Sequence, residues 1–107
     1  MAFTLQQKPN FTCEVTIPTP TGDGKVTFEF KHMSRKALKA FSESLGEGDT
    51  ARPEIEVLLD LVGGWTGVDE KFSPENLDIL IDNYPAAAPA IFEAYKRCLF
   101  EGKQKNS

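Results

Sequence analysis

The chain has 107 residues, 40% of them hydrophobic and 26% charged, which is the size and composition of one ordinary globular domain spanning residues 1–107. Its 16 Asp and Glu exceed its 12 Lys and Arg, and the net charge of −4 disfavours nucleic acid as the main partner. No apolar run reaches the ~18 residues of a membrane span. With one His and two Cys there is no metal-ligand cluster, so we expect a soluble binding protein with no active site, metal or cofactor.

Two segments near the start alternate between apolar and polar residues, which predicts strands over 11–17 and 25–31. Their apolar faces consist of Phe11, Cys13, Val15 and Ile17, and of Val26, Phe28 and Phe30. The connector 18–24 is dense in turn formers and predicts an antiparallel hairpin with a fairly long tip. His32 continues the second strand and is interpreted as a strand-end residue rather than a catalyst. Two strands alone are marginal in water, so helices or a partner must cover the apolar face.

Helical periodicity follows from Ser34 onward, where Ser34 is the expected N-cap of a first helix that ends before Gly46. A second helix is expected from Pro53 to Gly63-Gly64, with an apolar stripe of Ile55, Leu58, Leu59 and Val62. Residues 65–72 carry glycine and lack a sustained period, which predicts a loop with buried anchors.

Ser73 and Pro74 give a start signal for a third helix, whose apolar positions are Leu77, Leu80, Ile81 and Tyr84. Pro85 breaks this helix. The fourth helix then presents a stripe of Ile91, Tyr95, Cys98 and Leu99. The fold class is α+β, an N-terminal antiparallel β-hairpin packed on about four α-helices, with flexible ends at 1–10 and 101–107.

The two cysteines, Cys13 and Cys98, lie in predicted apolar stripes and show no CxxC spacing. We interpret them as reduced, buried, small hydrophobic residues, with a redox pair as the alternative.

Charge is distributed unevenly along the chain. From Glu43 to Asp82 there are eleven Asp and Glu against Arg52 and Lys71, a balance of −9. This is interpreted as a solvated face, with an acidic surface for a basic partner helix as the functional alternative; a divalent-cation site lacks the required spacing. Residues 25–39 carry a balance of +4, with five Lys and Arg against Glu29. Basic and acidic patches of this kind make head-to-tail self-association a further hypothesis.

The glycine-rich run 63–67 lacks both common phosphate-binding patterns, so a phosphate cradle is not expected. Its Trp65 is interpreted as a core plug at a helix end, with an interface anchor as the alternative.

Several short motifs in the second half of the chain resemble the tail assembly chaperones of long-tailed (siphovirus-type) bacteriophages and prophages. In that family a W-x-G-V block precedes F-S-x-E-N-L, a Tyr-Pro helix break and a Lys-Asn end. The matching residues cover roughly 55–106 and are Gly64-Trp65-Thr66-Gly67-Val68-Asp69-Glu70, Phe72-Ser73-Pro74-Glu75-Asn76-Leu77, Tyr84-Pro85, Ala90-Ile91, Ala94-Tyr95 and Lys105-Asn106. One departure is the link 69–72, which is shorter than in many relatives.

The resemblance implies a non-catalytic protein of the host bacterial cytoplasm that binds the tape measure protein, keeps it soluble during tail tube assembly, and is absent from the mature virion. Relatives are often made in two lengths by a translational frameshift, and the longer form would contact the tail tube protein. Gln104-Lys105-Asn106 is compatible with a slippery codon run.

The partner-binding residues expected on this basis are Trp65, Val68, Phe72, Ile91, Phe92 and Tyr95, with a core position as the alternative for each. The rival functions are a virion component, such as a tail-terminator or head-tail joining protein, and a small metal-dependent hydrolase that uses the carboxylates between Glu43 and Asp82.

Overall fold

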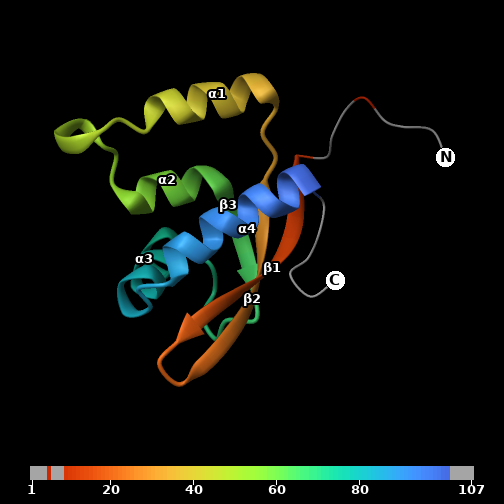
Figure 1. Ribbon diagram of the computed structural model, residues 1–107. Coiled ribbons are helices and arrows are strands. Elements are labelled where there is room, and N and C mark those ends of the chain that lie inside the picture. The colour runs from red at the N-terminus through yellow and green to blue at the C-terminus, as the bar shows by residue number, and fades with distance from the viewer. Residues whose placement is uncertain (1–4, 6–8, 102–107) are drawn as a thin grey trace.

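The computed structural model describes Leu5 and residues 9–101 of the chain. Within these residues, three strands and four α-helices follow one another with a short 3₁₀ turn between the first two helices (Figure 1). In chain order they are β1 (Asn10–Thr19), β2 (Gly22–Lys31), α1 (Arg35–Ser44), η1 (Gly48–Thr50), α2 (Glu54–Leu61), β3 (Val62–Thr66), α3 (Pro74–Asn83) and α4 (Ala87–Glu101). The predicted α+β class is confirmed.

The strands form one antiparallel sheet in the order β1-β2-β3. Its apolar face is built by the alternating residues predicted for β1 and β2, joined by Val62 and Trp65 of β3, which pair with Phe30 and Phe28. Helix α4 packs against β1, and α2 packs against β2 and β3. The cover that the hairpin requires is therefore supplied by the helices of the same chain.

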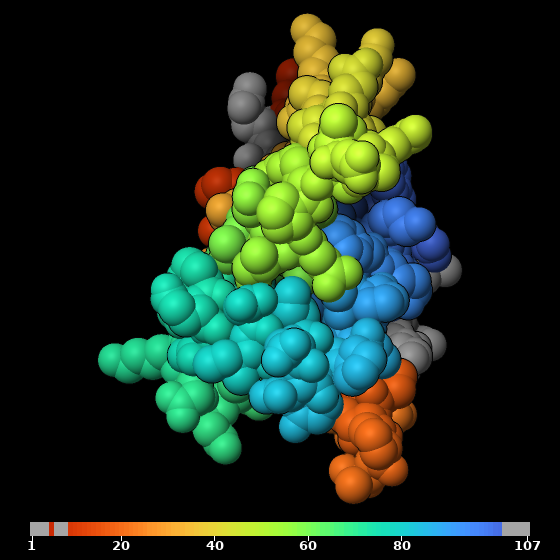
Figure 2. Space-filling view, turned by 90° about the vertical axis from the view of Figure 1, so that its left-hand side faces the viewer, coloured from red at the N-terminus to blue at the C-terminus, as the bar shows by residue number. Residues whose placement is uncertain are grey.

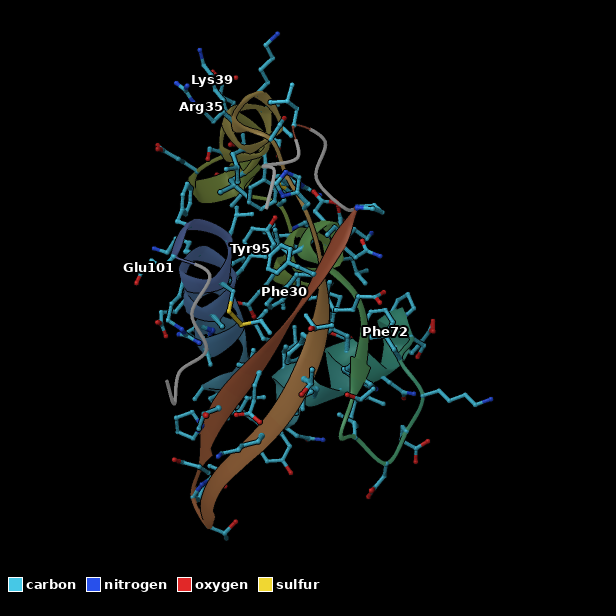
Figure 3. The ribbon with its side chains drawn as sticks, turned by 90° about the vertical axis from the view of Figure 1, so that its right-hand side faces the viewer. Phe30, Arg35, Lys39, Phe72, Tyr95 and Glu101 are labelled. Atoms are coloured by element: carbon cyan, nitrogen blue, oxygen red, sulfur yellow. A yellow bond between two sulfur atoms is a disulfide. The ribbon has the colours of Figure 1, made fainter. Side chains whose placement is uncertain are left out.

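The core lies between this sheet face and the helices. Its fully buried large side chains come from both layers and include Phe28, Phe30, Leu58, Leu61, Leu77 and Ile91. The ring of Tyr95 on α4 meets Phe30 edge-to-face, with 5.1 Å between the ring centroids (Figure 3). Aromatic contacts of this geometry add to the stability that burial provides.

The hairpin tip differs from the prediction of a long connector. Thr19 pairs with Gly22, so only Pro20 and Thr21 lie between the two strands. Gly22 has a φ of +128°, which residues other than glycine rarely adopt. The turn formers of 18–24 are thus spread over the strand ends as well as the turn.

The prediction was also wrong at 62–66, which form strand β3 instead of a helix end and the start of a loop. Helix α2 ends at Leu61, and its buried residues are Val57, Leu58 and Leu61. Of the predicted stripe, Leu58 is buried in the helix, Ile55 and Leu59 are half-buried, and Val62 is buried as the first residue of β3. The strand is hard to recognise in the sequence because Gly63 and Gly64 have no side chain and therefore show no alternation of apolar and polar residues.

Cys13 and Cys98 form a disulfide, which corrects the expectation of free thiols. Both residues are buried as predicted, Cys13 in β1 and Cys98 in α4. They are 85 positions apart in sequence, yet their Cα atoms are 6.4 Å apart, because α4 packs directly on β1. That proximity depends on tertiary packing and leaves no trace in the spacing of the cysteines.

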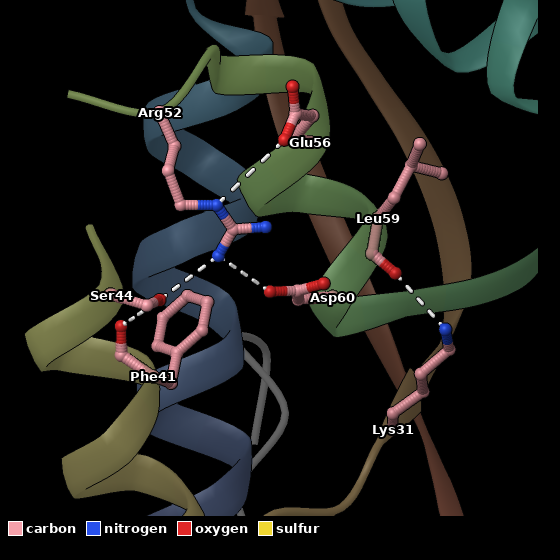
Figure 4. Close-up of polar contacts among 7 residues, drawn as sticks. All are labelled: Lys31, Phe41, Ser44, Arg52, Glu56, Leu59 and Asp60. Atoms are coloured by element: carbon pink, nitrogen blue, oxygen red, sulfur yellow. Dashed lines mark hydrogen bonds and ion pairs between the residues drawn. The ribbon is translucent and has the colours of Figure 1, made fainter. Parts of the chain in front are cut away.

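Helix α1 lies at the edge of the fold and has no fully buried residue. Ser34 caps it as predicted, accepting a hydrogen bond from the backbone N–H of Ala37. Its other end is held by Arg52, whose guanidinium donates to the Ser44 hydroxyl at 3.1 Å and forms an ion pair with Asp60 of α2 at 2.8 Å (Figure 4). This side-chain link connects α1 to the body of the molecule.

The break between α3 and α4 lies where it was predicted. Ser73 caps α3 by accepting from the backbone N–H of Asn76, Pro74 occupies the first turn, and the helix ends before Tyr84 and Pro85. The predicted flexible ends 1–10 and 101–107 fall largely outside the described residues. Two of those residues belong to regular structure, since Asn10 begins β1 and Glu101 ends α4.

Candidate partner-binding groove

A groove runs along the lower end of the molecule, between the hairpin tip, the loop that follows β3, and the C-terminal half of α3. It consists of two adjoining hollows of about 500 Å³ and 410 Å³, which share Val68, Asp69, Leu80 and Tyr84. Figure 2 shows α3 and the hairpin tip side by side at this end. The dimensions suit a peptide segment rather than a deeply enclosed small molecule.

Apolar side chains form the floor of the groove. Ile79 of α3 and Tyr84, which follows the helix, are 56% and 39% exposed, and large hydrophobic side chains exposed next to each other mark a candidate contact surface. Val68 and Leu80 next to them are half-buried. Tyr84 lies outward because Pro85 ends the helix and its backbone is extended at the C-cap.

The loop wall of the groove is held by specific contacts. The indole N–H of Trp65 donates to the carbonyl oxygen of Glu70 at 2.9 Å, and the Trp65 ring meets Phe72 edge-to-face at 5.2 Å between centroids. The Asn76 side-chain amide donates to the carbonyl oxygen of Lys71 at 2.8 Å. Gly67 turns the chain at a φ of +88°. The loop is therefore tied to both β3 and α3, which fixes the shape of the groove.

The rim of the groove is predominantly acidic. Asp23, Asp69 and Glu70 line it, and Lys25 is the one basic residue among the lining side chains of the described chain. Asp78 and Asp82 of α3 are also exposed, although they line neither hollow. Within the part that the structure describes, none of these carboxylates forms an ion pair. An apolar floor with a mainly acidic rim favours an amphipathic ligand with basic flanks.

The predicted partner-binding residues separate into two groups. Trp65, Val68 and Phe72 come together at the loop wall, where Val68 lines both hollows and Trp65 one of them. On α4, by contrast, Ile91 is fully buried and Tyr95 is 3% exposed, while Phe92 is half-buried. Figure 3 shows Tyr95 beside Phe30, and Phe72 well apart from both. The structure thus gives no single surface that contains all six.

The contacts of Tyr95 give it a structural role. Its hydroxyl donates to the carbonyl oxygen of Lys31 at 2.6 Å, which links α4 to the end of β2. Burial raises the pKa of Tyr95 to about 12, so the side chain stays protonated at neutral pH. A protonated, buried phenol of this kind holds two elements together and does not serve as a base.

Ile79, Leu80 and Tyr84 were not among the predicted binding residues. Leu80 and Tyr84 were predicted only as apolar positions of the third helix. Ile79 is the residue that the sequence could have indicated. It lies off the stripe that these positions form, next to Asp78, and an apolar residue on an acidic helix face has no packing role.

No group of three or more His, Cys, Asp or Glu among the described residues is placed so that it would hold a metal ion. The described helices include none that is both long and apolar enough to cross a bilayer.

The family model described as phage tail assembly chaperone matches residues 1–106. No curated protein and no solved structure is significantly similar to the chain.

Proposed function

Because the chain belongs to the family of phage tail assembly chaperones, we propose that it binds the tape measure protein and keeps that protein soluble while the tail tube assembles. It does so by contact alone, without catalysis. The observation that carries this proposal is the acidic-rimmed apolar groove, which brings the exposed hydrophobic side chains of Ile79 and Tyr84 together beside carboxylates.

The groove suggests how a client would be held. An amphipathic helix of the client lays its apolar stripe on Ile79, Tyr84 and Val68, and basic residues beside the stripe reach Asp69 and Glu70. Masking the stripe removes apolar surface from water, which is the source of the binding free energy. The acidic rim selects the orientation of the client helix and speeds its encounter.

The six predicted partner-binding residues have different places in this proposal. Val68 contacts the client, while Trp65 and Phe72 hold the loop that carries it. Ile91 and Tyr95 contribute by supporting the sheet on which the groove is built, since they lie in the core. Phe92 is half-buried and stays a candidate contact.

Coexpression with the tape measure gene tests the proposal. The wild-type chain should increase the soluble fraction of the tape measure protein, and Ile79→Asp should abolish that increase, because a charge on the floor opposes burial of the client stripe. The matched control is Phe100→Asp, since Phe100 is 69% exposed and lies at the end of α4, away from the groove. Equal solubility with and without the chaperone would refute the proposal.

A virion component, such as a tail-terminator or head-tail joining protein, is the alternative function. A chaperone acts in the host cytoplasm and leaves before the particle is complete, whereas a virion component remains. Mass spectrometry of purified particles separates the two, because a structural protein would be recovered in a fixed ratio to the tail tube protein.

A second, longer product belongs to the same proposal. A frameshift at the codons of Gln104-Lys105-Asn106, which fall outside the described residues, would extend the chain with a segment that contacts the tail tube protein. The nucleotide sequence and an immunoblot for a larger product test this directly. Codons that do not form a slippery run, with no overlapping frame downstream, would remove it.

A further inference from the structure

Helix α1 is held to the rest of the molecule more loosely than the other helices are. None of its residues is fully buried, whereas α2, α3 and α4 each bury at least one. The elements that pack closely on one another are the three strands and these three helices. Figure 1 shows α1 along the edge of the molecule, with a connecting segment at each of its ends. Elements with few buried contacts open before the rest of a fold does.

The loosely held helix nevertheless covers apolar surface. Leu38 and Phe41 are partly buried and pack against the core, and Leu45 follows them at helical spacing and is half-buried. Figure 3 shows Arg35 and Lys39 projecting from α1 away from the body of the molecule. Helix α1 is therefore amphipathic, with its apolar stripe turned inward. If it lifts, both the stripe and the core atoms beneath it lose their cover.

The charges of α1 oppose its helix dipole. Arg35 and Lys36 lie in the first turn, Glu43 lies in the last turn, and neither end carries a charge of the favourable sign. Each of these placements disfavours the helix. A helix of ten residues is also too short to persist in water without packing. Docking on the body therefore keeps α1 helical, and undocking is coupled to melting.

A polar link at one end completes the attachment. The Arg52 guanidinium joins Ser44 to Asp60, and the Arg52 backbone N–H donates to the carbonyl oxygen of Leu45 at 2.9 Å. The Arg52 and Asp60 side chains are 24% and 43% exposed, so their ion pair is weakened by water. At the other end, residues 32–34 have no regular structure. Lifting α1 thus breaks an exposed ion pair and half-buried contacts, and leaves the sheet and α4 intact.

We propose that α1 is a strap that lifts as a unit, and that an amphipathic helix of a client takes its place on the apolar surface below. The structure defines the occupant, because α1 itself shows what this surface accepts: a helix with apolar residues at positions i, i+3 and i+7, as in Leu38, Phe41 and Leu45. The identity of the client rests on the proposed function, whereas the lifting of α1 does not. Only the open form binds at this surface, so the apparent affinity follows the fraction of open molecules.

Hydrogen exchange of the full chain, followed by mass spectrometry of its peptides, tests the strap without a client. In the wild type, the amides of α1 should exchange at least about tenfold faster than those of α4. The charge exchange Lys36→Glu/Glu43→Lys keeps the net charge and gives both helix ends the favourable sign, so it should slow exchange in α1 about tenfold. Lys36→Gln/Glu43→Gln should lie between the two. Arg52→Ala should speed exchange in α1 about threefold, and Lys96→Ala on α4 is the control.

A hydrophobic dye reports whether lifting exposes apolar surface. Fluorescence of anilinonaphthalene sulfonate should rise for Arg52→Ala and fall for the charge exchange, in the same order as the exchange rates of α1. In coexpression with the tape measure gene, Arg52→Ala should raise the soluble fraction of the tape measure protein and the charge exchange should lower it. The groove is the same in both variants, since Lys36, Glu43 and Arg52 do not line it.

The strap and the proposed function fail in different ways. Exchange in α1 as slow as in α4, variants that shift exchange in the same direction, or dye binding that ignores them would each overturn the strap. It is also overturned if the wild type solubilises the tape measure protein and both variants do so equally well. If the wild type has no effect on the client, the proposed function is wrong, and exchange and dye binding still decide whether α1 lifts.

Discussion

Reduction of the bond between Cys13 and Cys98 should lower the stability of the protein by a large and calculable amount. The bond closes a loop across a sequence separation of 85 residues, because it joins β1 near one end of the described chain to α4 near the other. In the chain-entropy description, a loop of this length restricts the unfolded state by about 4.6 kcal/mol at room temperature. The reduced thiols stay in the same core positions, so packing changes little.

The expected change in melting temperature follows from the size of the chain. Unfolding entropies near 2.1 cal/mol/K per residue give about 0.22 kcal/mol/K for this protein, so a loss of 4.6 kcal/mol corresponds to about 20 °C. Thermal unfolding followed by circular dichroism, with and without a non-thiol reductant, measures it.

Two controls make that experiment decisive. Mass spectrometry of the untreated protein should find it lighter by two hydrogens than the fully reduced chain, and a Cys98→Ala variant should show no response to the reductant. If the bond is present by mass but the melting temperature does not move, the loop-closure reasoning is refuted. If the mass shows two free thiols in protein purified under oxidising conditions, the link itself is refuted.

Three further predictions concern single side chains or backbone positions. The raised pKa of Tyr95 means that the folded state holds the phenol proton more tightly than the unfolded state does. The contribution of Tyr95 to stability is therefore complete below pH 10 and is lost as the pH rises toward about 12. In denaturation experiments at a series of pH values, Tyr95→Phe should remove this loss of stability, and it should cost about 1 kcal/mol at neutral pH through the lost hydrogen bond. Arg52→Ala should destabilise the fold by only about 0.5–1 kcal/mol, because its ion pair with Asp60 is partly exposed, but should accelerate amide hydrogen exchange in α1 relative to α4. Gly67→Ala should lower the free energy of unfolding in urea by about 1–2 kcal/mol, which is more than for Gly48→Ala. The reason is that the φ of +88° at Gly67 is further from the left-handed minimum than the φ of +55° at Gly48. An equal loss at both positions would contradict this.

Elements with a simple period and a clear start signal could be predicted from the sequence. Ser34 and Ser73 mark helix starts because a serine hydroxyl just before an apolar-periodic run can accept a hydrogen bond from a free backbone N–H of the first turn. Both side chains accept that hydrogen bond. The alternation of β1 and β2 is unambiguous because one face is buried and the other polar.

The features that the sequence did not predict depend on contacts between distant segments. Strand β3 forms because Gly64 and Thr66 find partners in β2, and two glycines in five residues give no alternation to detect. The disulfide depends on α4 crossing β1. The groove depends on where Pro85 stops α3, which decides that Tyr84 faces solvent although its spacing fits the core stripe.

The chain has a single tryptophan, and that residue lines one hollow of the groove. Its indole N–H donates to the Glu70 carbonyl oxygen, so the ring is held in place while the residue stays partly exposed. Intrinsic fluorescence therefore reports on this region alone, free of signal from other indoles. A ligand that covers the groove should shift the emission to shorter wavelength and protect it from a soluble quencher, which makes occupancy measurable without a label.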